Sequence, residues 1–180
     1  EDGDAATVLT ADVLTATAGS AITLDTTVAT ADLTATAGGN IDIDETDSID
    51  LASVTTADGS ITVDSGGALT ATDVNSSATD NDTNDISLTT TAGDIAVVSI
   101  NAGSVNDVTL TAAAAITEDG DAATVLTADV LTATAGSAIT LDTTVASADL
   151  ATSAAGDIDI DETHSIVLAS VTTADGSITV

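Results

Sequence analysis

Short runs in which apolar and polar residues alternate recur along the whole chain. Two examples are Leu33-Thr34-Ala35-Thr36 and Ile41-Asp42-Ile43-Asp44, which place Leu, Ala and Ile on one face and Thr and Asp on the other. The large apolar residues are all Val, Ile or Leu, and Thr occupies 36 of the 180 positions. β-Branched side chains fit a pleated surface well, so this composition favours strands. The pattern therefore predicts an all-β protein whose strands each bury one face.

The sequence repeats itself on two scales. Residues 1–63 and 118–180 align without a gap at an offset of 117, with 55 of 63 positions identical. Within this unit the leucine of the pattern Leu-Thr-x-Thr-Ala-Gly recurs at nearly even steps, at Leu14, Leu33, Leu51, Leu69, Leu88, Leu110, Leu131 and Leu150. Six of these steps make up the offset of 117, so the sequence predicts six coils per unit, each of roughly 19–20 residues.

A second apolar column supports coils that stack on one another. Its members are Ile22, Ile41 and Ile61 in the first copy and Ile139, Ile158 and Ile178 in the second. Glycines fall between the two strands of a coil, where a tight corner favours a residue that tolerates positive φ: Gly19, Gly39, Gly59, Gly93 and Gly136. We therefore predict one continuous parallel β-solenoid over residues 1–180, part of a longer tandem array, with residues 75–85 forming an outward loop.

Composition excludes several classes of function. The chain has 30 acidic residues and no Lys or Arg, a formal net charge of -30 that opposes binding to nucleic acid. It has no Cys, Met, Pro or aromatic residue, and its longest apolar run, residues 112–116, is far shorter than the roughly 20 residues of a membrane span. His164 is the only histidine, and Asp47 takes its place in the other copy, which favours a surface substitution over a general base. We expect no enzyme and no organic cofactor.

Cations are the expected partners of so acidic a chain. The loop 80–85 alternates carboxylate and amide oxygens through Asp80, Asp82 and Asp85, as calcium loops do. A weaker candidate is Glu118-Asp119-Gly120-Asp121, with its copy Glu1-Asp2-Gly3-Asp4. Stacked coils would also align outward carboxylates in columns: Asp25, Asp44 and Asp64, with Asp142 and Asp161 in the second copy. These residues are candidate Ca²⁺ ligands, and the alternative is that they only solvate the surface. In either case calcium, high salt or mild acid should stabilise the fold.

Thr-x-Thr pairs suggest a further, lesser possibility. Regular threonine ladders on a β-solenoid are a feature of several ice-binding proteins, and this chain has Thr15/Thr17, Thr34/Thr36, Thr70/Thr72, Thr89/Thr91 and Thr132/Thr134. Exposed threonine is also simply favourable in strands.

Three segments carry a resemblance to a known family: Leu33 to Ile43, Leu88 to Val97 and Leu131 to Leu141. Their pattern resembles the coils of filamentous-haemagglutinin-like adhesins and other giant bacterial surface proteins with β-helix repeats. The resemblance implies a right-handed β-helix at the cell surface or outside the cell. We therefore expect a structural, non-enzymatic rod segment of a large secreted surface protein, an adhesin stalk or extracellular fibre.

The expected partners follow from that interpretation. They are neighbouring repeats or copies of the chain, cations, and host or neighbouring-cell surfaces reached through parts outside this sequence. The alternative is a self-assembling filament or sheath subunit whose copies stack end to end.

Overall fold

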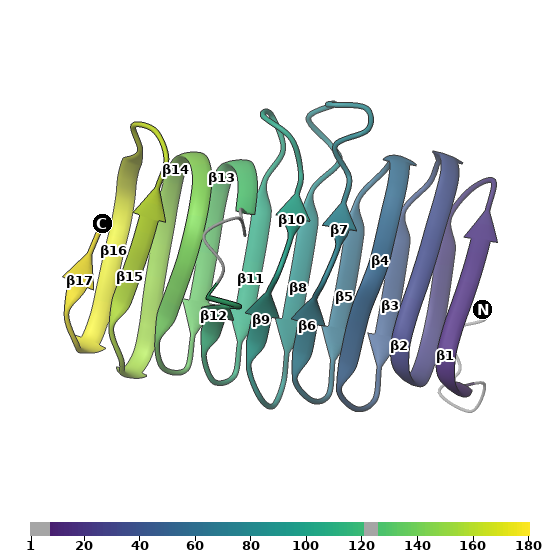
Figure 1. Ribbon diagram of the computed structural model, residues 1–180, viewed down its shortest axis with the longest axis horizontal. Helices are drawn as coiled ribbons and strands as arrows, with labels where there is room; N and C mark the ends of the chain where they lie inside the picture. The colour runs from purple at the N-terminus through teal and green to yellow at the C-terminus, as the bar shows by residue number, and fades with distance from the viewer. Residues whose placement is uncertain (1–7, 121–125) are drawn as a thin grey trace.

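The computed structural model describes residues 8–120 and 126–180, where the chain forms only β-strands and the turns between them. The strands pair in parallel with the strands of the coils before and after them. Together they wind into a β-solenoid of about eight turns, with β1 at one end and β17 at the other (Figure 1). The predicted all-β, parallel solenoid is confirmed.

The strands are short where a coil has tight corners and long where a strand bends around a corner. Their bounds are β1 (Leu9–Ala18), β2 (Ile22–Gly38), β3 (Ile41–Glu45), β4 (Ile49–Asp58), β5 (Ile61–Ser65), β6 (Leu69–Ala71), β7 (Val74–Asn75), β8 (Ile86–Thr90), β9 (Ile95–Val97), β10 (Ile100–Asn101), β11 (Val108–Ala112), β12 (Ile116–Glu118), β13 (Leu126–Ala135), β14 (Ile139–Ala155), β15 (Ile158–Glu162), β16 (Val167–Asp175) and β17 (Ile178–Thr179).

Apolar residues stacked in ladders form the core of the flattened rod. Ladder A lies in layer A, which contains β3, β5, β8 and β11, and ladder B lies in layer B, which contains β6, β9, β12 and β15. A third ladder runs through β4, β7, β10 and β13 and contains Val54, Val74, Ile100 and Leu126. Ladder A, in layer A, contains Ile22, Ile41, Ile61, Ile86, Val108, Leu131 and Ala148. Ladder B, in layer B, contains Ile49, Leu69, Ile95, Ile116, Ile139, Ile158 and Ile178. All of them except Ile178, in the last coil, are at most 6% exposed. Small aliphatic side chains suffice because each coil covers the core of its neighbours.

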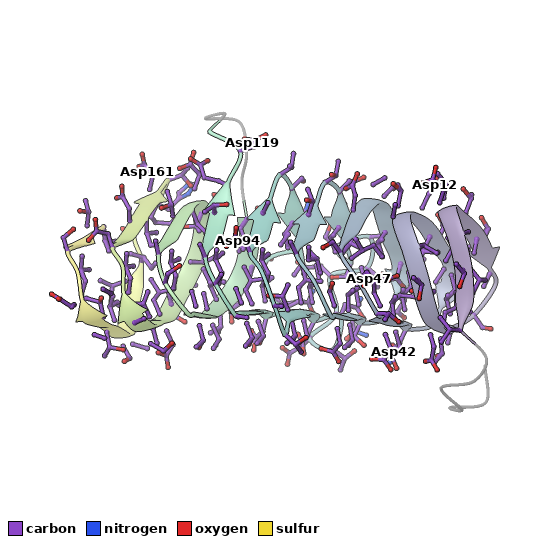
Figure 2. The ribbon with its side chains drawn as sticks, turned by 90° about the horizontal axis from the view of Figure 1, so that it is seen from below. Asp12, Asp42, Asp47, Asp94, Asp119 and Asp161 are labelled. Carbon is purple, nitrogen blue, oxygen red and sulfur yellow. The ribbon has the colours of Figure 1, made fainter. Side chains whose placement is uncertain are left out.

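The two copies of the repeated sequence lie in opposite layers. Ile22 and Ile139 are equivalent in sequence, yet Ile22 belongs to ladder A and Ile139 to ladder B. Ladder A reaches Leu131 in five steps and Ala148 in six, so Ile139 falls between them. The repeated unit therefore makes about five and a half turns, in place of the six predicted. Figure 2 shows the consequence, because Asp42 of the first copy and Asp161 of the second lie on opposite faces.

The loop between β7 and β8 explains why the repeated unit makes about five and a half turns and not six. Leu69 and Leu88 are separated by one coil length in sequence, a spacing that predicts neighbours in adjacent coils. In the structure Leu69 lies in layer B, whereas Leu88 pairs with Val63 and Leu110 in layer A. Only half a turn separates the two leucines because residues 76–85 leave the coil and project from one edge of the rod (Figure 1). The turn from Ile61 to Ile86, which contains the loop, is accordingly the longest along ladder A.

Most of the corner glycines do not adopt the positive φ that was predicted for them. Of the five corner glycines, only Gly93 has a positive φ, at 93°. At Gly39, Gly59 and Gly136 an added Cβ would overlap backbone atoms of the preceding coil. These three residues are therefore required for close approach between coils, and the explanation through positive φ is wrong for them.

Candidate functional site

The acidic column predicted from the sequence is present in layer A. Asp25 is the Cα partner of Asp44, and Asp44 is the partner of Asp64, so three carboxylates follow one another on adjacent coils. In the second copy Asp142 is the partner of Asp161. Because the copies lie in opposite layers, these two groups of carboxylates are on opposite faces of the rod. The alignment is confirmed within each copy, but the groups do not form one surface.

Crowding of carboxylates is evident beside this column and at the loop. Partial burial, with added repulsion from Asp44 and Asp64, raises the pKa of Asp42 above its ordinary value of 3.8. Partial burial, with added repulsion mainly from Asp85 and Asp129, raises the pKa of Asp107. The chain has no Lys or Arg to relieve either repulsion.

A shallow groove runs along the acidic column. Asp25, Asp44 and Asp64 line it together with Glu45 and Thr46 at the corner of the coil. Within residues 8–120 and 126–180, no group of three or more acidic or histidine side chains is arranged to hold a metal ion. Calcium binding by the two acidic columns therefore stays a prediction, and their geometry supports a general attraction for cations.

The carboxylates of the loop bind the neighbouring coil. Asp80 accepts hydrogen bonds from the Ser104 hydroxyl at 2.7 Å, the Ser104 N–H at 3.1 Å and the Asn106 side-chain amide at 3.2 Å. Asp85 accepts one from the Asp107 N–H at 2.9 Å. Asp82 is exposed. Two of the three predicted calcium ligands thus tie the loop to residues 104–107.

The weaker candidate for a calcium site falls largely outside the described residues. Residues 1–4 and Asp121 lie there, so calcium binding by the segment 118–121 and its copy stays a prediction.

Sequence reasoning missed the structural role of glutamate. Glu45 is 4% exposed, and its carboxylate accepts hydrogen bonds from the Thr26 hydroxyl at 2.8 Å, the Val28 N–H at 2.9 Å and the Asp47 N–H at 3.0 Å. Glu162 makes the same three kinds of contact in the second copy, to Thr143, Val145 and His164. The one signal in the sequence was the rarity of Glu, which occurs four times against 26 Asp. Its longer side chain reaches into the corner and satisfies donors there.

His164 keeps a backbone role that does not depend on its imidazole. Its N–H donates to Glu162 as that of Asp47 does to Glu45, and its exposed ring contacts the Thr163 hydroxyl at 2.8 Å. The position can therefore exchange His for Asp without changing the corner.

The Thr-x-Thr pairs do not form one ladder. Thr17 and Thr34 lie in the column that continues through Thr55 to Asn75 of β7, whereas Thr132/Thr134 lies in layer A. The register instead aligns Ser87/Thr89, Thr109/Thr111 and Thr132/Thr134 on three successive coils of layer A. Ice binding stays a prediction that now depends on this shorter array.

Comparison with known proteins finds no family model, no curated protein and no solved structure that matches the chain. In the described parts of the chain, no helix is long and apolar enough to cross a membrane.

Proposed function

We propose that this chain is a structural rod segment of a large secreted surface protein, serving as the stalk of an adhesin or as part of an extracellular fibre. The observation that carries the proposal is the unbroken parallel pairing of coils from β1 to β17. A solenoid in which each coil contacts only its neighbours can be lengthened by adding units, and added units change length without changing the cross-section. The resemblance to filamentous-haemagglutinin-like coils supports the surface location and the right-handed winding.

Burial within the rod supports a role that depends on length. Leu51, Ile61 and Val63 are 0% exposed because the next coil covers them. Their copies in the last coils, Leu168, Ile178 and Val180, are 43%, 47% and 50% exposed. Each coil inside the rod therefore completes the core of the coil before it, as expected of a solenoid built from stacked units.

The charge of the rod suits a spacer. With a net charge of -30 and no basic residue, neighbouring rods repel one another and stay separate in solution. A spacer benefits from this repulsion, because its ends then remain available to other parts of the protein.

The test is made on the native protein. Its intact mass should correspond to a single polypeptide with many copies of the repeated unit, and antibodies against the repeat should label thin rods on the cell surface. Removal of one unit should shorten these rods and leave adhesion by other parts of the protein intact. A short native chain, or label confined to the cytoplasm, would rule out the stalk.

A second candidate is a subunit that stacks end to end into a filament, because the parallel pairing that joins coils within one chain can also join the coils of two chains. Sedimentation of the purified chain distinguishes the candidates, since the subunit forms concentration-dependent fibres and the stalk segment stays monomeric.

A further inference from the structure

Two acceptor sequences for N-linked sugars occur in the chain, both at the loop between β7 and β8. They are Asn75-Ser76-Ser77 and Asn81-Asp82-Thr83. No other Asn of the chain is followed two residues later by Ser or Thr. An Asn-x-Ser/Thr sequence can receive a sugar when it lies on an accessible surface loop. The structure separates the two on this criterion.

Asn75 is held within the coil. It belongs to β7, pairs with Thr55 and Asn101 in adjacent coils, and its side-chain oxygen accepts hydrogen bonds from the Ser77 N–H at 2.9 Å and hydroxyl at 2.8 Å. Ser76 is 0% exposed, and its N–H donates to the Asn101 carbonyl at 3.0 Å. A glycosyltransferase cannot bind this segment without breaking the strand.

Asn81 is presented at the tip of the loop. Asn81, Asp82 and Thr83 are all exposed, and the Asn84 N–H donates to the Asn81 carbonyl at 3.0 Å, which closes a tight turn. The Asn81 side-chain amide makes a long contact, 3.4 Å to Asp58 on the exposed surface. The amide and the Thr83 hydroxyl are therefore accessible together.

The base of the loop is fixed while its tip is open. Asn84 is 0% exposed and donates to the Thr79 carbonyl at 2.6 Å, and Asp80 accepts from Ser104 in the next coil. A substituent on Asn81 extends into solvent and leaves these contacts intact. The loop projects from the edge of the rod (Figure 1), and a sugar on Asn81 replaces the long contact of its amide to Asp58.

We propose that Asn81 is an N-glycosylation site, and that Asn75 is not. In the transfer, a bond forms between the Asn81 side-chain nitrogen and the anomeric carbon of a nucleotide- or lipid-diphosphate sugar. The bond from that carbon to the diphosphate oxygen breaks, the diphosphate departs, and the amide proton passes to a base of the transferase. The inference goes beyond the proposed function and requires only that the folded loop is accessible.

The test uses the folded chain and a soluble N-glycosyltransferase with a nucleotide-activated hexose. Intact mass should show one hexose per chain, and mapping with an Asp-specific protease should place it on Asn81, because trypsin has no site in a chain without Lys or Arg. Asn81→Gln and Thr83→Val should abolish the transfer. Thr83→Ser and Asn75→Gln are the matched controls and should retain it.

Two results would overturn the proposal. One is a hexose on Asn75 of the folded chain. The other is no transfer to the folded chain while a peptide of residues 78–86 is modified in the same reaction. Neither result bears on the rod function, which is tested by chain length and location.

Discussion

At the scale of single residues, Glu45 shows how a charged side chain can be buried without a basic partner. Its carboxylate accepts two backbone N–H groups and one hydroxyl, so hydrogen bonds take the place of an ion pair. The outward Asp44, one residue before it in the same strand, is exposed and makes no comparable set of contacts. Two adjacent acidic residues thus have opposite effects on stability, one satisfying donors and the other adding repulsion.

We predict that Glu45→Gln destabilises the chain by about 1–3 kcal/mol, because one acceptor oxygen becomes an NH₂ group that faces a donor. Asp44→Asn removes the same charge on the outer face and should leave stability unchanged or increase it. Chemical denaturation of the two variants measures the difference. Equal stability of both variants would show that the corner does not depend on the Glu45 carboxylate.

The dependence of stability on pH should follow Asp42 and Asp107. Because burial and neighbouring carboxylates raise their folded pKa values above 3.8, these two carboxyl groups bind more protons in the folded chain than in the unfolded chain between 3.8 and the raised values. The free energy of unfolding should therefore fall as pH rises through this window and recover on acidification. Denaturation at a series of pH values should show a smaller change in Asp42→Asn and Asp107→Asn.

Asp157 should have the opposite effect on the pH dependence of stability. The Ser177 N–H and hydroxyl hold its pKa below 3.8, so its contribution is present above the unfolded pKa and is lost as pH falls through the folded pKa. Asp157→Asn should therefore not reduce the gain in stability on mild acidification. A reduced gain in this variant would contradict the assignment of that gain to Asp42 and Asp107.

At the scale of strands, the outward carboxylates of β2, β3 and β5 form a line of like charges. A spacing of about 4.8 Å between coils costs about 1 kcal/mol per pair in water, less when salt screens it. The column Asp25, Asp44 and Asp64 has no basic residue to offset this cost. Cations in solution are the available counter-charge.

We predict that calcium or sodium raises the thermal midpoint of the chain above its value in low salt with a chelator at neutral pH. Millimolar calcium is compared with sodium at matched ionic strength, since equal effects indicate screening and a larger effect of calcium indicates binding. Replacement of Asp25, Asp44 and Asp64 by Asn should raise the low-salt midpoint and reduce the response to either salt. An unchanged midpoint in all three solutions would show that water already solvates the column.

At the scale of the whole molecule, the period-two alternation was sufficient to predict the architecture, because Ile41-Asp42-Ile43-Asp44 can bury one face only if another coil stacks on it. It also placed Asp25, Asp44 and Asp64 in one column. The coil register was not predictable in the same way, since Leu-Thr-x-Thr patterns occur in both layers. The spacing between Leu69 and Leu88 equals one coil length in the sequence, but in the structure it covers only half a turn, because the loop 76–85 takes up the remaining residues.

Because each repeated unit makes about five and a half turns, equivalent residues of successive units lie on opposite faces of the rod. A sequence that is nearly identical in the two copies forms layer A in one and layer B in the other, so it must fit both sides of the rod. The common fit is possible because both layers need the same alternation of small aliphatic and outward polar residues. Features carried once per unit should then alternate between opposite edges of a longer rod.

Cysteine cross-linking tests this register directly, because the chain has no cysteine of its own. Thr70 is the Cα partner of Ala96 in the structure, whereas coils counted from Leu69 to Leu88 would place Thr70 beside Thr89. Adjacent parallel strands bring Cα atoms to about 4.8 Å, within the range of roughly 4.4–6.8 Å that a disulfide spans. Under mild oxidation the pair Thr70→Cys with Ala96→Cys should form a disulfide, and the pair Thr70→Cys with Thr89→Cys should stay reduced. The reverse result would restore six coils per unit and place both copies of the repeat in the same layer.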